Sequence, residues 1–238
     1  MKGAAAGLMP ESRAREEICR VGRSLFERGY VHATAGNISV RLADGFLITP
    51  TDACLGFLEP ARLAKVDSQG VQISGDRASK TMSLHRAIYA AATRFLPQTA
   101  CVIHTHSTYC VALTLQPPAC EGSEVVEGAA ELLPPITPYF VMKVGHVPRM
   151  AYQRPGAPQM AQDVAQRIAE YGARGIPLRA VMLERLGPNV WHDTPAAAMA
   201  TLEELEETAQ IYHITHPKPA ALDAAQLQEL RESFGAIW

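Results

Sequence analysis

Residues 79–106, SKTMSLHRAIYAAATRFLPQTACVIHTH, join a helical pattern directly to an extended one. Leu84, Ile88 and Phe95 recur roughly on one helical face, and Ser79 stands where an N-cap is expected. The end of the stretch, CVIHTH, is a run of Val, Ile and Thr that predicts a strand, with two histidines one residue apart. A helix beside such a strand favours a layered domain of mixed helices and strands.

The same alternation continues on both sides of this stretch. Helices are expected at 11–31, 160–175 and 195–213. Extended segments are expected at 34–56, 63–74, 136–152 and 180–193, the first containing an Asp-Gly hairpin turn and the last a Gly-Pro turn. Residues 117–135, rich in Pro, Gly and Glu, are expected to form an irregular insertion. The pattern predicts one α/β or α+β domain over residues 1–238, with residues 1–10 flexible.

Composition narrows the class of protein. With 238 residues and 47% apolar content, the chain can bury a large core. Its 22 basic and 24 acidic residues form no long run of one sign, which argues against a nucleic-acid partner. No stretch approaches the roughly 18 apolar residues of a membrane span. Five cysteines without a CxxC pair are typical of reduced thiols, so we expect a cytoplasmic protein with no membrane partner.

The two histidines of the predicted strand suggest a metal site. Side chains alternate in a strand, so His104 and His106 should lie on one face while Thr105 points away. Two neutral imidazoles on one face can bind one transition metal, and zinc is a common choice. The alternative is a pair of ordinary hydrogen-bonded histidines, since an HxH pattern alone is short. The rest of the sequence has to decide between these interpretations.

Several separated motifs together resemble the class II aldolase/adducin family. They are GNISVRL, ITPTDACLG, ASKT, VIHTHS, PPITPYFVMKVGHVP and YQRPG, and the resemblance runs from the first helix to LEELEETAQIY. Within that family they are most similar to the branch of 3-oxo-tetronate 4-phosphate decarboxylases. The resemblance implies a central, mostly antiparallel sheet flanked by helices, and a homotetramer with active sites at subunit interfaces.

The resemblance also implies a phosphate site. Gly36 and Asn37 match the family's phosphate-binding turn, Thr51 matches its second loop, and Ser79 lies at a helix N-terminus, where partial positive charge favours an anion. Each of these residues could equally have a purely structural role. Asp52 departs from the family pattern, which commonly has Gly there, and its carboxylate would repel phosphate unless it points away or meets a cation.

Two further departures concern the chemistry. Thr81 stands at the position where the sugar-phosphate aldolases have a glutamate that acts as general acid/base. A threonine hydroxyl cannot carry out that proton transfer at neutral pH. Decarboxylation of a β-keto acid does not need that base, and Lys80 could bind the departing carboxylate or deliver a proton. Leu186 stands where aldolases have a third metal-ligating histidine. We therefore assign catalytic roles to Lys80 and Thr81 and look elsewhere for the third ligand.

His146 is the first choice for that ligand, because it follows a glycine and the resemblance places the run after it in the same sheet. His85, one turn along the helix from Thr81, is the second choice. The remaining histidines, expected at the surface or in packing, are His32, His192, His213 and His216.

The predicted function is a metal-dependent carboxy-lyase, most simply a zinc enzyme, that converts a 3-oxo-tetronate 4-phosphate to dihydroxyacetone phosphate and carbon dioxide. The alternatives are a sugar-phosphate aldolase or epimerase of the same family, or a non-catalytic adducin-like binding protein. Loss of the glutamate and of the third histidine permits the last alternative, whereas the retained histidine pair and phosphate loops argue against it.

Overall fold

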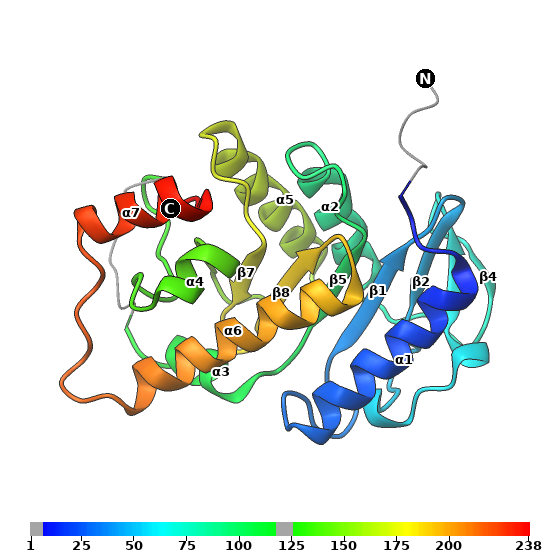
Figure 1. Ribbon diagram of the computed structural model, residues 1–238. Coiled ribbons are helices and arrows are strands. Elements are labelled where there is room, and N and C mark those ends of the chain that lie inside the picture. The colour runs from blue at the N-terminus through cyan, green and yellow to red at the C-terminus, as the bar shows by residue number, and fades with distance from the viewer. Residues whose placement is uncertain (1–6, 118–125) are drawn as a thin grey trace.

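The centre of the molecule is one eight-stranded sheet. A computed structural model describes residues 7–117 and 126–238 (Figure 1). The strand order is β4-β3-β2-β1-β5-β8-β7-β6, and every neighbouring pair is antiparallel except β6 and β7. The mostly antiparallel sheet expected from the family resemblance is therefore confirmed.

The helices and strands have the following bounds. The strands are β1 Asn37–Arg41, β2 Gly45–Ile48, β3 Ala64–Asp67, β4 Gln72–Ser74, β5 Cys101–His104, β6 Arg149–Met150, β7 Ala180–Leu183 and β8 Gly187–His192. The α-helices are α1 Glu11–Glu27, α2 Met82–Ala92, α3 Thr108–Thr114, α4 Pro138–Lys143, α5 Pro158–Ala173, α6 Pro195–Ile214 and α7 Ala224–Phe234. Two short 3-10 helices, Leu55–Phe57 and Pro60–Arg62, precede β3.

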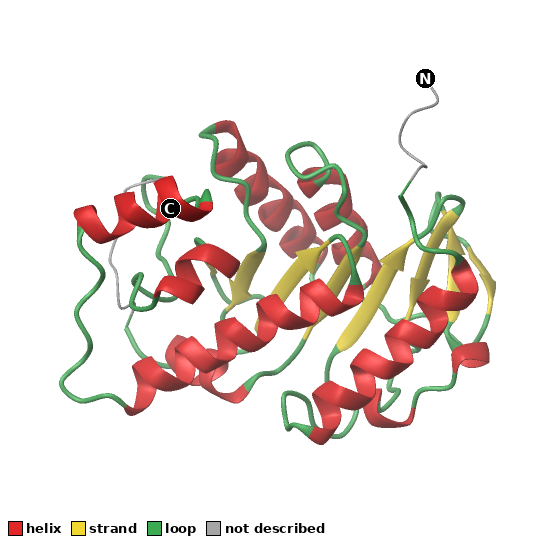
Figure 2. Cartoon of the chain, viewed as in Figure 1, coloured by secondary structure: helices red, strands yellow, loops and turns green. Residues whose placement is uncertain are grey.

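Helices cover both faces of the sheet (Figures 1 and 2). Helices α1, α3, α4 and α6 lie on one face, and α2 and α5 lie together on the other. Alternation along β5 separates the two cores, since Ile103 packs toward α1 and α6 while Val102 packs toward α2 and α5. Val190 and Trp191 divide in the same way along β8.

The register of the three central strands aligns three polar residues. Asn37 of β1 lies opposite His104 of β5, and His104 lies opposite Asn189 of β8. Directly opposed residues in antiparallel strands have side chains on the same face. The three side chains therefore form a row on the face that α2 and α5 cover, at the end of the sheet where β5 stops.

Most of the expected elements are present. The Asp-Gly turn between β1 and β2 is confirmed, and Gly45 is required there because a Cβ on it would lie 2.1 Å from the Val66 carbonyl oxygen. In the predicted insertion, residues 126–135 form turns and one isolated bridge, while 118–125 lie outside the described residues. Of the segment predicted to be flexible, residues 1–10, the first six lie outside the described residues.

Several expectations were wrong. The segment 136–152, predicted as extended, contains α4, because Thr137 caps the Phe140 N–H and Pro138 occupies the first helical turn. Helix α3, which follows the histidine strand, had no predicted counterpart in the sequence. Ser79 is not the N-cap of α2, which is Thr81, one residue before the first helical residue. The turn between β7 and β8 precedes the Gly-Pro pair, which itself opens β8.

Helix α7 was not predicted from the sequence, although its start is marked by a capping box between Asp223 and Gln226.

No helix in the described part of the chain combines the length and apolar content needed to cross a bilayer.

Candidate active site

A pocket of about 380 Å³ is lined by the ends of the central strands and by the N-termini of α2 and α5. It gathers all the predicted phosphate-site, catalytic and paired-histidine residues, which are Gly36, Asn37, Thr51, Ser79, Lys80, Thr81, His104 and His106. These residues come from four separate segments of the chain. Their convergence is what a small-molecule site requires, and it could not have been deduced from any one motif.

His104 is the last residue of β5 and is fixed in one tautomer. Its Nδ1 lies 2.9 Å from the Pro188 carbonyl oxygen, which can only accept, so Nδ1 donates and Nε2 keeps a free lone pair. Burial, with a smaller contribution from the neighbouring His106, lowers the pKa of His104 to about 4. The imidazole is therefore neutral at pH 7, as a metal ligand must be.

His106 follows the strand but lies beside its partner. The ring centroids of His104 and His106 are 5.1 Å apart. Burial and the charge of His32, whose ring centroid is 6.4 Å away, lower the pKa of His106. The intervening Thr105 is fully buried, and its Oγ1 is hydrogen-bonded to the Ser107 hydroxyl at 2.6 Å. Thr105 thus makes a structural contact while the two imidazoles share the pocket, as the alternation argument requires.

The pair fits a divalent metal as two of its ligands. Both rings are held in their neutral form, and His104 has the backbone hydrogen bond that commonly orients a ligating imidazole. Within residues 7–117 and 126–238, no group of three or more His, Cys, Asp or Glu residues could hold a metal ion. Leu186 lines the pocket near the pair but has no donor atom. A third protein ligand of the usual kind is therefore missing from the described part of this chain.

His146 is not that ligand, which corrects the prediction from the sequence. It lines a different cavity with Leu96 and Ile237 and precedes β6, whereas His104 ends β5. Two strands separate β5 from β6, which corresponds to roughly 14 Å at the usual strand spacing. The run after His146 does join the same sheet, but at its far edge, and for that reason the prediction failed.

The surroundings of His146 show a structural role. Its Nδ1 is 3.2 Å from Glu131 Oε1, and its ring stacks on Trp238 with the centroids 4.2 Å apart. Glu131 also accepts hydrogen bonds from the Tyr171 hydroxyl at 2.5 Å and from the Val147 N–H at 2.9 Å. Burial raises the pKa of the Glu131 carboxyl, but hydrogen bonds and the charge of His146 outweigh it and lower the pKa overall.

His85, the second choice, is also held by the fold. It is fully buried in α2, and its Nδ1 is 2.7 Å from the Ser39 hydroxyl of β1. Burial, together with the nearby His104, lowers its pKa to about 3. Ser39 in turn is hydrogen-bonded to the Tyr89 hydroxyl at 2.9 Å. This network ties α2 to the central sheet and positions the N-terminus of the helix at the pocket.

The N-terminal turn of α2 supplies hydroxyl groups and a cation. The Ser79 and Thr81 hydroxyls are 2.9 Å apart, and the Thr81 N–H points back to the Ser79 hydroxyl at 3.4 Å. Lys80 lies exposed between them at the pocket. A helix N-terminus with hydroxyls and an ammonium group is suited to bind an anion.

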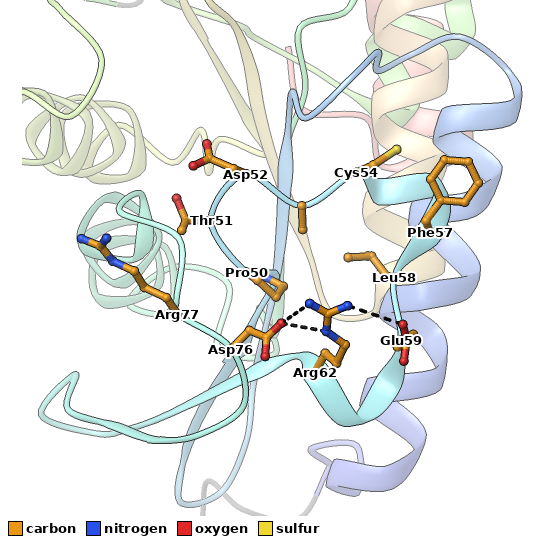
Figure 3. Close-up of a pocket in the computed structure, with 11 residues that line it drawn as sticks. Pro50, Thr51, Asp52, Cys54, Phe57, Leu58, Glu59, Arg62, Asp76 and Arg77 are labelled. Carbon is orange, nitrogen blue, oxygen red and sulfur yellow. Dashed lines mark hydrogen bonds and ion pairs between the residues drawn. The ribbon is translucent and has the colours of Figure 1, made fainter.

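A second cavity of about 390 Å³ shares Pro50, Thr51 and Asp52 with the main pocket (Figure 3). One of its two arginines, Arg62, is paired with Asp76 and with Glu59. Asp52 has a φ of +56°, a left-handed conformation that favours glycine and is tolerated by aspartate. Glycine, which the family resemblance implies for this position, adopts this conformation without strain.

Arg154 and Asn189 are among the residues of the main pocket that were given no role from the sequence. Arg154 belongs to the motif YQRPG, which was noted for its resemblance but given no role, and it precedes the N-terminus of α5. Asn189 had no signal in the sequence, because only the pairing of β8 with β5 places it beside His104.

Comparison with known proteins agrees with the geometry. The sequence profile described as Class II Aldolase and Adducin N-terminal domain matches residues 16–213. The chain belongs to this family. A 3-oxo-tetronate 4-phosphate decarboxylase from Cupriavidus necator is 49% identical over 233 residues, covering 96% of this chain and 99% of that protein. The protein of the same name from Escherichia coli K12 is 39% identical, covering 93% of this chain and 96% of its own length.

Solved structures show the same fold. The crystal structure of YgbL from Escherichia coli has a TM-score of 0.78 and 37% identity, covering 93% of this chain and 99% of that one. L-fuculose-1-phosphate aldolase from Thermus thermophilus has a TM-score of 0.68 and 27% identity, covering 85% of this chain and 94% of that one. The family and the branch expected from the sequence motifs are therefore confirmed.

Proposed function

We propose that this protein is a carbon-carbon lyase that decarboxylates a 3-oxo-tetronate 4-phosphate to dihydroxyacetone phosphate and carbon dioxide. The observation that carries the proposal is the single pocket that joins the histidine pair, the α2 N-terminus and the 36–37 and 51 loops. The names of the relatives that align along almost the whole chain support the same reaction.

The phosphate of the substrate is assigned to the polar end of the pocket. Gly36 and Asn37 offer a backbone turn, Thr51 a hydroxyl, and Ser79 a hydroxyl at the α2 N-terminus. With the phosphate held there, the rest of a four-carbon chain can extend toward His104 and His106. The substrate carboxylate then needs a cation, and Lys80 is the one that the α2 turn presents.

The reaction itself breaks one bond. The bond between the carboxylate carbon and its neighbour breaks, carbon dioxide leaves, and the electron pair forms an enediolate through the adjacent keto group. His104 and His106 would hold a divalent metal through their nitrogen lone pairs, and that metal would supply a Lewis acid for developing negative charge. Lys80 binds the carboxylate or returns a proton to carbon, and Thr81 contributes its hydroxyl to the same turn. No general base is required before carbon dioxide departs.

The direct test is to incubate the purified, metal-supplied protein with a 3-oxo-tetronate 4-phosphate and measure released carbon dioxide and dihydroxyacetone phosphate. Stoichiometric release of both is the expected result. A Lys80→Met variant, close in length and without charge, is the matched control for the assigned cation. Absence of release from the wild type with metal supplied would refute the proposal.

A non-catalytic binding protein is the second candidate. The observation that favours it is the combination of Thr81 and Leu186, which leaves position 81 without a carboxylate acid/base and position 186 without a third imidazole. An aldolase or epimerase of the same family is disfavoured by Thr81 for the same reason. Binding of dihydroxyacetone phosphate without turnover of any sugar-acid phosphate would identify the non-catalytic case.

Further properties follow from the same proposal. We infer that the metal is zinc, because two neutral imidazoles are typical zinc ligands, and that the protein is a homotetramer, as the family resemblance implies. We also infer that residues 1–238 act as one domain and that the protein works in the cytoplasm. The continuous eight-stranded sheet supports a single domain. The free thiols of the four described cysteines support a cytoplasmic location.

A further inference from the structure

Asn189 carries a buried amide group with no partner. The residue has 0% of its surface exposed, and neither its Oδ1 nor its Nδ2 has a hydrogen-bond partner. Leaving a buried polar group unpaired costs about 1–3 kcal/mol, and an amide contains both a donor and an acceptor. An apolar residue would fit the core better, so the fold gains nothing from an asparagine at this position.

The position of Asn189 connects this amide with the pocket. Asn189 lies opposite His104 across the β5–β8 pair, and the residue lines the pocket. On the other side of His104, Asn37 lies in register and has an unpaired, buried Oδ1 of its own. The row of three side chains therefore combines one free imidazole nitrogen with amide groups whose hydrogen-bonding capacity is unused.

We propose that Asn189 is a catalytic residue that binds the hydroxy-ketone part of the substrate. Its Nδ2 donates a hydrogen bond to the keto oxygen, and its Oδ1 accepts one from the neighbouring hydroxyl group. The inference rests on the proposed function, which supplies a substrate with these two groups on adjacent carbons. A single amide matches such a pair because its donor and acceptor point in the same direction from one carbon.

The chemistry gives this contact a role in the reaction. When carbon dioxide departs, the electron pair moves onto the keto oxygen, where a donor already in place stabilises the developing charge. The Nδ1–H of His104 is already donated to the Pro188 carbonyl oxygen, so it is not free to bind the keto oxygen. Asn189 therefore supplies an N–H donor on the strand beside His104.

The test combines ligand binding, stability and kcat, and its binding measurements use product, so they do not depend on turnover. Isothermal titration calorimetry compares dihydroxyacetone phosphate with hydroxyacetone phosphate, which lacks the hydroxyl group. The wild type is expected to prefer dihydroxyacetone phosphate by about tenfold or more, as sites built to bind a hydroxyl do. Asn189→Leu, which has nearly the same size, is expected to bind the two compounds equally and to lower kcat about 100-fold.

Thermal unfolding provides the second readout and the control. Asn189→Leu should unfold at the same temperature as the wild type or higher, because it replaces an unpaired buried amide. Val190→Ala changes the next residue of β8, on the opposite face, and should lower stability while keeping the preference for dihydroxyacetone phosphate. An Asn189→Leu protein that keeps this preference, or that is clearly destabilised, would overturn the inference.

The remaining outcomes separate the inference from the proposed function. If the wild type releases carbon dioxide but binds the two compounds equally, the inference is wrong and the function stands. If the wild type neither binds dihydroxyacetone phosphate nor releases carbon dioxide, both are wrong.

Discussion

Replacing His146 by alanine should destabilise the protein without affecting its metal site. The imidazole is 7% exposed, stacks on Trp238 at 4.2 Å and contacts the Glu131 carboxylate at 3.2 Å. Its removal leaves a buried carboxylate with one partner fewer and a cavity beside an indole ring. Breaking a buried pair of this kind costs about 3 kcal/mol, which corresponds to a fall in melting temperature of about 6–12 °C for a chain of this size.

Thermal unfolding and elemental analysis of the same preparations test this expectation. His146→Phe is a matched control, because it keeps the aromatic stack and loses only the contact with Glu131, so its loss of stability should be smaller. His106→Ala should behave in the opposite way, losing metal with a smaller fall in melting temperature, because His106 is only partly buried. The reasoning is refuted if His146→Ala keeps its melting temperature and loses its metal, since His146 would then be a ligand after all.

Three other predictions concern the pocket and the helix behind it. Replacement of His104 or His106 by alanine should remove bound metal, which elemental analysis would show. Thr105→Val should retain the metal and lower the free energy of unfolding by only about 1 kcal/mol, for its lost hydrogen bond, in urea unfolding. Lys80→Ala should lower kcat/KM for carbon dioxide release about 100-fold while changing the free energy of unfolding by less than about 0.5 kcal/mol, because the side chain is exposed. His85 has a folded-state pKa of about 3, below its unfolded value of 6.5, so the stability it contributes is complete above pH 6.5 and is lost as the pH falls toward 3. The expected slope from this group is about 1.4 kcal/mol per pH unit, and His85→Leu should show a correspondingly flatter pH dependence in urea unfolding between pH 6 and 4.

The fold was largely predictable from local patterns, and the exceptions have specific causes. The hairpin of β1 and β2 and the helices α1, α5 and α6 follow from periodicity and turn residues that act over short distances. The helix α4 was missed because its β-branched and aromatic residues favour a strand. The N-cap at Thr137 and the proline at 138 start a helix there despite that preference. Local propensity is a weak guide where six residues form the whole element.

The site was predictable only in part. Motifs identify candidate residues, but the order and register of the strands determine which of those residues lie close together. The pairing of His104 with His106 was predicted from the alternation of a strand, and the two rings are 5.1 Å apart although the strand itself ends at His104. The exclusion of His146 depends on the order of strands, which places β8 and β7 between β5 and β6. Asn189 became visible only through the register of β5 and β8. Neither fact can be read from the spacing of residues along the chain.

The charges of the pocket give a physical reason why a decarboxylase can do without the glutamate of its aldolase relatives. The charged side chains that line the pocket, apart from the histidines, are the cations Lys80 and Arg154 and the anion Asp52. A glutamate at position 81 would add a second anion next to Lys80. A sugar-acid phosphate carries a carboxylate in addition to its phosphate, and two like charges about 4 Å apart repel by about 4 kcal/mol near a protein surface. Thr81 removes that repulsion while keeping a hydroxyl in the α2 turn, 2.9 Å from the Ser79 hydroxyl. The substitution that removes the aldolase acid/base therefore also makes the pocket more favourable for a substrate with a carboxylate, and carbon dioxide can depart from that substrate without a base.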